Sequence, residues 1–222
     1  MSKQGQGGQG NSGRGGSQQG GSSGNRQSGQ GGNQGRQSAD LNKAIATTLS
    51  VARNEYKYYA DIETDYGDIP LADCYVADLN QVFLNLLVNA AHAIRDVVGD
   101  GSARRGTIRI ATRLDGDRIE IRISDTGSGI PEHVRGKIFD QFFTTKGVGR
   151  GTGLGLAIAR AVVVEKHRGT LHFETEVGKG TAFFVRIPVT AQPEGDGLDA
   201  PAADPHASSM PPVPSAPTGA LA

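Results

Sequence analysis

Two asparagines and a histidine in the middle of this 222-residue chain have the types and spacing of a ligand-binding group. Asn85, Asn89 and His92 follow one another at intervals that place them on one side of a helix. Neutral amide oxygens on such a face can bind a hard cation such as Mg²⁺. An ordinary solvated helix face explains the same pattern, so this group alone leaves both interpretations open.

A second group is the segment Asp125-Thr-Gly-Ser-Gly-Ile-Pro131, which follows an apolar stretch. A carboxylate at the end of a strand, beside two glycines, can accept a hydrogen bond from a flat amino group that comes close to the backbone. A simple turn that begins with Asp is the alternative. The segment by itself does not decide between the two.

A third group is the glycine-rich loop Gly149-Arg-Gly-Thr-Gly-Leu-Gly155. Glycines spaced by two let backbone N–H groups converge, and the start of a helix adds partial positive charge that suits phosphate. The spacing differs from the dinucleotide fingerprint, and the Gly-Lys-Ser/Thr ending of the P-loop is absent. Lys146 and Arg150 beside the loop strengthen the anion-binding interpretation.

Hydrophobic periodicity predicts the elements that must position these groups. Helical patterns cover residues 40–59, with Asp40 as N-cap, and residues 77–98, 131–139 and 154–166. Strand patterns predict a short strand at 61–65 and two hairpins, 107–124 and 170–188, with turns at Asp115-Gly116 and Gly178-Lys179-Gly180. Blocks of helices and antiparallel strands favour an α+β fold with two layers, a helix layer against a sheet.

Composition divides the chain into three parts. Residues 1–37 are almost entirely Gly, Gln, Ser and Asn, and residues 191–222 are rich in Pro, Ala, Ser and Asp. Neither part has enough apolar side chains to offset the entropy of ordering, so we predict disordered tails on both sides of one domain at 38–190. The few basic residues of the first tail favour a flexible linker over nucleic-acid binding.

Charge and cysteine content limit the compartment. The formal net charge is zero, and Cys74 is the single cysteine, which excludes an intrachain disulfide and fits a reducing environment. No apolar run approaches the ~20 residues that a membrane span needs, and the N-terminus lacks the apolar core of a signal peptide. We therefore expect a cytoplasmic protein with no membrane partner.

Taken together, the three groups and one further segment resemble the catalytic ATP-binding domain of sensor histidine kinases, in the ATPase superfamily that includes gyrase, Hsp90 and MutL. The similar segments are Asn85–Ala93 (its N box), Asp125–Pro131 (G1 box), Ile138–Lys146 (F box) and Gly151–Ala159 (G2 box). The resemblance covers about residues 39–189. It implies the Bergerat-type α/β sandwich of that superfamily, with ATP and Mg²⁺ as ligands.

The resemblance also implies a role for each matching residue. Asn89 would ligate Mg²⁺ with help from Asn85, His92 would lie near the phosphates, and Asp125 would bind the adenine amino group. Asn85 and Lys146 would be the catalytic residues. The adenine pocket would be completed by Gly127, Gly129 and Ile130. The mobile lid would contain Phe142, Phe143, Thr145 and Lys146. The phosphate loop would consist of Gly151, Thr152, Gly153, Leu154 and Gly155.

The residue at position 85 bears on the acceptor. Relatives that hydrolyse ATP, and related serine kinases, have Glu there, because water or a serine hydroxyl benefits from a base. A neutral imidazole needs none, so Asn85 favours histidine as the acceptor of the γ-phosphoryl group. The resemblance thus implies a histidine-kinase-type phosphotransferase of two-component signalling.

The acceptor itself is expected on another domain. A full kinase of this family carries its acceptor histidine on a helical hairpin before the ATP domain, and none of the five histidines here has that context. We therefore expect a separate histidine-phosphotransfer and dimerisation domain, or a response regulator, as partner. The alternatives are a non-catalytic ATP-binding or interaction module and an anti-sigma-type serine/threonine kinase, which Asn85 disfavours.

Overall fold

The computed structural model describes residues 35–99, 103–145 and 152–190. Residues 1–34 and 191–222 of the predicted tails, and the predicted site residues Lys146 and Gly151, lie outside this part of the chain. The elements are, in order, β1 (Gln37–Ala39), α1 (Leu41–Tyr56), β2 (Ala60–Tyr66), β3 (Ala72–Cys74), α2 (Val76–Val98), β4 (Gly106–Asp115), β5 (Arg118–Asp125), η1 (Glu132–Lys137), α3 (Gly155–Arg160), η2 (Ala161–Lys166), β6 (Thr170–Glu176) and β7 (Gly180–Pro188).

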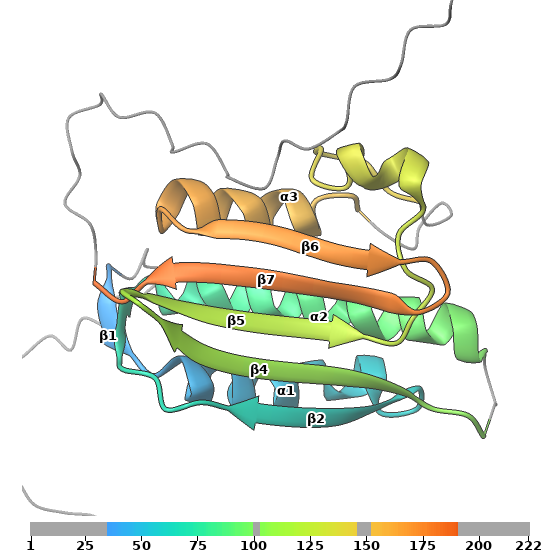
Figure 1. Cartoon of the computed structure of the whole chain (residues 1–222), viewed down its shortest axis with the longest axis horizontal. Coiled ribbons are helices and arrows are strands. Elements are labelled where there is room, and N and C mark those ends of the chain that lie inside the picture. Colours follow the sequence, from blue (N-terminus) through green and yellow to red (C-terminus); the bar gives the residue numbers. More distant parts are fainter. Residues whose placement is uncertain (1–34, 100–102, 146–151, 191–222) are drawn as a thin grey trace, which may run out of the picture. The chain divides into compact units, whose positions relative to one another are not determined.

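Five strands form one mixed sheet in the order β2-β4-β5-β7-β6, and α1 and α2 lie against one face of it (Figure 1). β2 and β4 are parallel, and the other neighbours are antiparallel. Both predicted hairpins are confirmed. The first turn lies one residue later than predicted, because Asp115 still pairs with Arg118, and Gly116 takes the positive φ of 64° that glycine adopts without strain.

The core lies between this sheet and its helices, as the predicted two-layer α+β fold requires. Alternate residues of β5 point inward, and Ile119, Ile121 and Ile123 are buried. They belong to one apolar cluster with the buried stripe of α2, which includes Phe83 and Ile94. α1 begins where predicted, with the side chain of its N-cap Asp40 accepting a hydrogen bond from a backbone N–H.

Two of the predicted helices differ in type. The segment predicted at 131–139 is the 3₁₀ helix η1, and the helix predicted at 154–166 is α3 followed by the π-helical segment η2. The wider turn of η2 brings the N–H of His167 to the carbonyl of Val162, at 3.2 Å. Periodicity therefore located these helices but did not distinguish their turn geometry.

The packed fold begins earlier than the predicted boundary at residue 38. Gln37 pairs with Cys74 at the start of the two-stranded sheet β1–β3, and Arg36 donates to the carbonyls of Asp73 (3.3 Å) and Lys166 (2.9 Å). Arg36 and Gln37 thus belong to the domain and not to the tail. The two strands were missed because three residues are too few to show a period.

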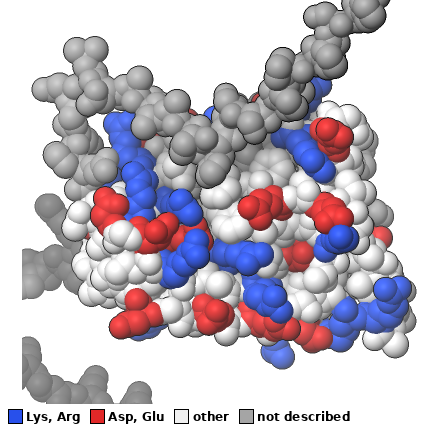
Figure 2. Space-filling view, in the orientation of Figure 1, with Lys and Arg blue, Asp and Glu red and all other residues white. Residues whose placement is uncertain are grey.

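The face of the sheet that the helices leave uncovered carries ion pairs between neighbouring strands. Figure 2 shows basic and acidic side chains interspersed over this face. Arg109 pairs with Glu63 (2.6 Å), and the nearly buried Glu120 receives both Arg113 (2.7 Å) and Arg186 (2.6 Å). The charges on these strands therefore largely compensate one another. Among the described helices, none combines the length and the apolar character needed to cross a bilayer.

Candidate active site

A cavity of about 630 Å³ lies where α2, the end of β5, η1 and the start of α3 meet. It brings together most of the predicted site residues, namely Asn85, Asn89, His92, Asp125, Gly129, Ile130, Phe143, Thr145, Thr152, Gly153 and Gly155. Gly127, Phe142 and Leu154 are described but are not among its lining residues. One concave site thus collects groups that are up to seventy residues apart in the sequence.

The carboxylate of Asp125 lies at the end of β5, beside the cavity. Its Oδ1 accepts a hydrogen bond from the backbone N–H of Gly127 at 2.8 Å. Burial raises the pKa of Asp125 to about 6, and hydrogen bonds from the N–H groups of Gly127 and Thr181 act in the opposite direction. At neutral pH the group is therefore an anion with lone pairs that a ligand can use.

The glycines after Asp125 allow the loop to pack closely. A Cβ atom on Gly127 would lie 2.6 Å from the carbonyl carbon of Ala93 on α2. Gly129 has a φ of 72°, and its Cβ would lie 2.4 Å from the carbonyl oxygen of Glu176. The loop therefore packs closely between α2 and the β6–β7 turn. Gly127 is needed for this close packing, although it does not line the cavity.

The polar side of α2 faces the cavity, as the helical spacing predicts. The side chain of Asn85 joins two elements, because its Nδ2 donates to the carbonyl of Gly155 (2.9 Å) and its Oδ1 accepts from Gln81 (2.9 Å). The Nε2 atom of His92 lies 3.7 Å from a carboxylate oxygen of Glu55 on α1. Asn85 therefore fixes the start of α3 as well as lining the cavity.

The segment predicted as a lid divides into two parts. Phe143 lines the cavity, whereas Phe142 is 72% exposed and has a positive φ of 64°. Gly153 also has a positive φ, and a Cβ there would lie 2.4 Å from the carbonyl carbon of Phe142. The backbone of the segment therefore touches the glycine loop, while the ring of Phe142 does not enter the site in this conformation.

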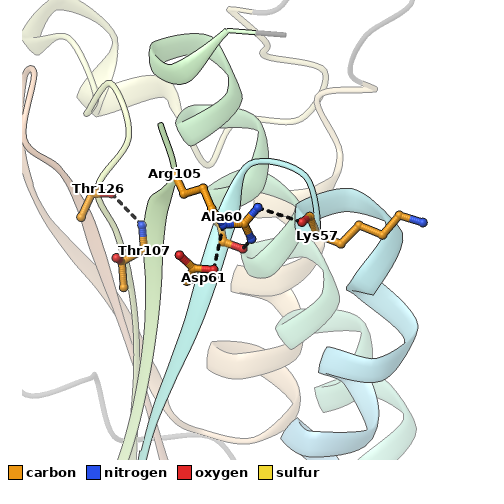
Figure 3. A network of polar contacts seen from close by, with 6 residues as sticks. All are labelled: Lys57, Ala60, Asp61, Arg105, Thr107 and Thr126. Atoms are coloured by element: carbon orange, nitrogen blue, oxygen red, sulfur yellow. Dashed lines mark hydrogen bonds and ion pairs between the residues drawn. The ribbon is translucent and has the colours of Figure 1, made fainter. Parts of the chain in front are cut away.

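A polar network supports the strand ends beside the site (Figure 3). Arg105 donates to the carboxylate of Asp61 (2.8 Å) and to the carbonyl of Ala60 (2.6 Å), which joins the starts of β2 and β4. Thr107 on β4 donates its N–H to the hydroxyl of Thr126 at 2.9 Å. The network therefore restrains the residue that directly follows the Asp125 carboxylate.

Sequence reasoning missed Thr181. This residue pairs with Asp125 across the β5–β7 ladder, lines the cavity and is only 6% exposed. A threonine in a β-rich segment gives no functional signal by itself. The signal lies in the alternation of β7, which places Thr181 on the same inward face as the buried Phe183, Val185 and Ile187.

Comparisons with known proteins agree with this architecture. Residues 75–191 match the family model described as histidine kinase-, DNA gyrase B- and HSP90-like ATPase. The sensor histidine kinase ZraS of Klebsiella oxytoca is 37% identical over 160 residues, which are 70% of this chain and 32% of ZraS. Sporulation kinase E of Bacillus subtilis strain 168 is 39% identical over 127 residues, which are 57% of this chain and 16% of that kinase.

The comparison with solved structures leads to the same group of proteins. The catalytic domain of the histidine kinase ThkA superposes with a TM-score of 0.61 and 28% identity, and the match covers 71% of this chain and 98% of that domain. The chain therefore corresponds to a whole catalytic domain, but it spans a third or less of the two curated kinases, with 32% and 16% of their lengths.

Proposed function

We propose, since the chain belongs to the histidine kinase-, DNA gyrase B- and HSP90-like ATPase family, that it binds ATP and transfers the γ-phosphoryl group to a histidine on a separate domain. The observation that carries the proposal is the partly buried Asp125 carboxylate in a cavity lined by the amide face of α2 and the glycines before α3. The kinase relatives and the ThkA catalytic domain support it.

Asp125 would recognise the base. Its pKa of about 6 leaves it ionised at neutral pH, so that it accepts a hydrogen bond from the adenine amino group. Gly129 and Ile130 line the same cavity. A cavity that combines apolar side chains with a few correctly placed polar groups is typical of a nucleotide-base pocket.

The amide oxygens of Asn89 and Asn85 would hold Mg²⁺ together with phosphate oxygens. Both residues line the cavity, and the Asn85 oxygen that accepts from Gln81 keeps a second lone pair. Amide oxygens suit Mg²⁺ because it prefers few protein ligands alongside phosphate and water. When bound, the ion would supply positive charge that offsets the charge of the phosphates.

The remaining predicted residues would orient the triphosphate. Thr152, Gly153 and Gly155 line the cavity next to Asn85, and backbone N–H groups of such a loop can donate to phosphate. Lys146 and Gly151 are proposed for the same role from their places in the F and G2 boxes. The neutral Asn85 provides no base, which suits an imidazole acceptor because that acceptor already has a free lone pair.

The partner would be a histidine-phosphotransfer domain, which in turn serves a response regulator. We place the reaction in the cytoplasm, where the free thiol of Cys74, which is buried, stays reduced. Because the chain spans a minor part of its curated relatives, the acceptor domain is proposed from the family and not from a contact in this structure.

Titration of a fluorescent ATP analogue into the full chain tests the pocket. Asp125→Asn should weaken ATP binding by roughly 1–3 kcal/mol, because it places an amide where an acceptor of the adenine amino group is needed. Asp117→Asn, at the exposed turn between β4 and β5, is the matched control and should bind as the unmodified chain does. Equal affinities for all three proteins would refute the assignment of the base pocket.

Two further measurements test the metal and the transfer. Asn89→Ala should weaken ATP binding clearly more in the presence of Mg²⁺ than in the presence of EDTA. Equal losses of ATP affinity under the two conditions would exclude Asn89 as a metal ligand. Labelled ATP and a panel of isolated histidine-phosphotransfer domains should give an acid-labile phosphate on one of them, and Asp125→Asn should reduce its yield at limiting ATP. Binding of ATP without transfer to any acceptor would favour the non-catalytic module.

A further inference from the structure

A row of three polar side chains crosses the inner face of the sheet beside the cavity. Asp125 on β5 pairs with Thr181 on β7, which pairs with Thr175 on β6. The row therefore begins at the cavity with Asp125 and Thr181 and ends behind them with Thr175. The inward-facing row next to it is apolar and consists of Ile123, Phe183 and Phe173.

The Thr175 hydroxyl has three hydrogen-bond partners in this row. Its Oγ1 lies 2.8 Å from the N–H of Ile130, 3.1 Å from the carbonyl oxygen of Gly180 and 3.0 Å from the hydroxyl of Thr181. The N–H of Ile130 can only donate, and the carbonyl of Gly180 can only accept. The single hydrogen of Thr175 therefore goes to Gly180, which leaves Thr175 as an acceptor towards Thr181.

This assignment fixes the direction of the Thr181 hydroxyl. Thr181 donates its only hydrogen to Thr175, because no other arrangement satisfies all three contacts. What its oxygen can offer to the cavity is then lone pairs alone. Asp125 beside it is also purely an acceptor when ionised. The two neighbouring polar groups thus share one polarity.

We propose that Thr175 is a positioning residue that makes the pocket select 6-amino purines over 6-oxo purines by holding the Thr181 hydroxyl as an acceptor. The inference rests on the proposed function, since it assumes that the base binds at Asp125. An adenine amino group donates to two acceptors at this edge. The 6-oxo group of guanine would instead place its lone pairs against those of the Asp125 carboxylate and the Thr181 hydroxyl. Binding is then weaker, because a buried polar group is left without a partner.

Thr175→Val in the full chain is the test, because valine keeps the shape of threonine and removes the hydroxyl. The Thr181 hydroxyl is then free to turn and donate into the cavity. Affinities for ATP and GTP are measured by competition with a fluorescent ATP analogue. We expect the preference for ATP over GTP to fall by about fivefold, the usual effect of one neutral hydrogen bond. Thr175→Ser keeps the hydroxyl and should restore the preference.

A ratio of affinities separates positioning from a general structural effect. Loss of the acceptor for Ile130 weakens the loop for both nucleotides alike, so it cancels in the ratio. Thr170→Val removes a hydroxyl from an exposed position of the same strand and should leave the ratio unchanged. Circular dichroism and melting verify that each variant is folded, and Thr175→Ala replaces Thr175→Val if valine does not fit.

The outcomes separate this inference from the function on which it rests. An unchanged ratio in folded Thr175→Val, or no recovery in Thr175→Ser, overturns the role of Thr175. If neither Thr175→Val nor Thr175→Ala folds, Thr175 is a structural residue and the inference is equally wrong. An unmodified chain that binds ATP and GTP equally also refutes it. An unmodified chain that binds neither nucleotide refutes the proposed function itself.

Discussion

The two ends of α2 lie beside polar clusters that differ in whether their groups are open to a ligand or already paired within the protein. Towards its C-terminal half the helix faces the cavity, where Asp125 has free lone pairs. At its N-terminal end a second cluster, which we term the β1 clasp, joins the first described residues to η2. The clasp consists of Arg36, Asp73, Tyr75, Asp78, Lys166 and His167. Figure 1 places β1 at one end of the sheet and η1 at the other.

Asp73 contributes its backbone carbonyl to the clasp, and the other five side chains contact one another or the backbone. His167 uses both ring nitrogens, since Nε2 accepts from the N–H of Tyr75 (3.0 Å) and Nδ1 donates to the carbonyl of Val162 (2.8 Å). Arg36 and Lys166 both lie over the ring of Tyr75, at 5.1 and 4.1 Å from its centroid. Such a cluster stabilises the fold, because its groups are occupied without a ligand.

Burial affects the two clusters differently. It raises the pKa of Asp125 to about 6, and it lowers the pKa of His167. In both cases the neutral form is favoured, but only Asp125 lies at a cavity and is charged at neutral pH. Asp125 thus fits a binding residue, because it stays charged at a cavity although burial disfavours the charge. His167 fits a structural residue, because its neutral ring completes the hydrogen bonds around it.

The largest expected effect is in the clasp. His167→Ala should lower the free energy of unfolding by about 3 kcal/mol, because it leaves a cavity and an unpaired N–H on Tyr75. The ATP affinity of the folded protein should not change. Urea denaturation and nucleotide titration of the same samples measure the two quantities. His172→Ala, which removes an exposed imidazole stacked on Phe184, is the control and should have a small effect.

The pH dependence of the unmodified chain provides a second check on His167. Its pKa is lower in the folded state than in the unfolded chain, so the folded state favours the neutral ring. The stability it contributes is fully present above the unfolded pKa of about 6.5 and is lost as the pH falls through the folded value. If His167→Ala lowered the ATP affinity as well as the stability, the clasp and the cavity would not be independent clusters.

The next effect concerns Asp125 and has the opposite sign. Its folded pKa of about 6 is raised, so its contribution to stability is present below the unfolded pKa of about 4 and is lost as the pH rises through 6. Asp125→Asn should therefore stabilise the nucleotide-free protein at pH 8 by about 1–2 kcal/mol and have little effect at pH 4. Thermal melting at the two pH values measures this. A loss of stability at pH 8 would mean that the carboxylate is needed for the fold.

Local patterns sufficed for the elements that build the cavity. The stripe of α2 that includes Phe83 and Ile94 and the alternation of Ile119, Ile121 and Ile123 predict a helix on a sheet, as observed. The G1 segment predicts a carboxylate at a strand end, and Asp125 lies at the end of β5. These features depend only on residues that are close together in the sequence, so the sequence alone was enough to predict them.

Features that depend on distant partners were not predictable in this way. β1 and β3 are strands only because they pair with each other, and Thr181 acquires its place from the register with Asp125. The π-helical segment η2 packs against α2, β6 and β7, and His167 after it is bonded to the N–H of Tyr75. Long-range hydrogen bonds leave no periodic trace in the sequence, so the clasp was missed altogether.

The smallest expected effect concerns the edge of the clasp. Arg36→Ala in the full chain should lower the free energy of unfolding by about 1 kcal/mol, because two hydrogen bonds to backbone carbonyls are lost at a partly exposed site. Arg36→Lys should recover only part of this loss. The planar guanidinium reaches the carbonyls of Asp73 and Lys166 with two different nitrogens, whereas an ammonium is a single donor centre. Arg53→Ala, on the exposed side of α1, is the control.

A chain trimmed to begin at Ser38 sharpens the same comparison. It lacks both Arg36 and the Gln37–Cys74 pair, so it should lose at least as much stability as Arg36→Ala, while a chain that begins at Gly35 should melt with the full chain. ATP affinity should be equal in all three, because the clasp and the cavity lie at opposite ends of α2. Equal melting of the Ser38 chain and the full chain would show that the Arg36 bonds add nothing. The domain would then begin at residue 38, as its composition alone suggests, and the clasp would be reduced to the contacts of Tyr75, Lys166 and His167.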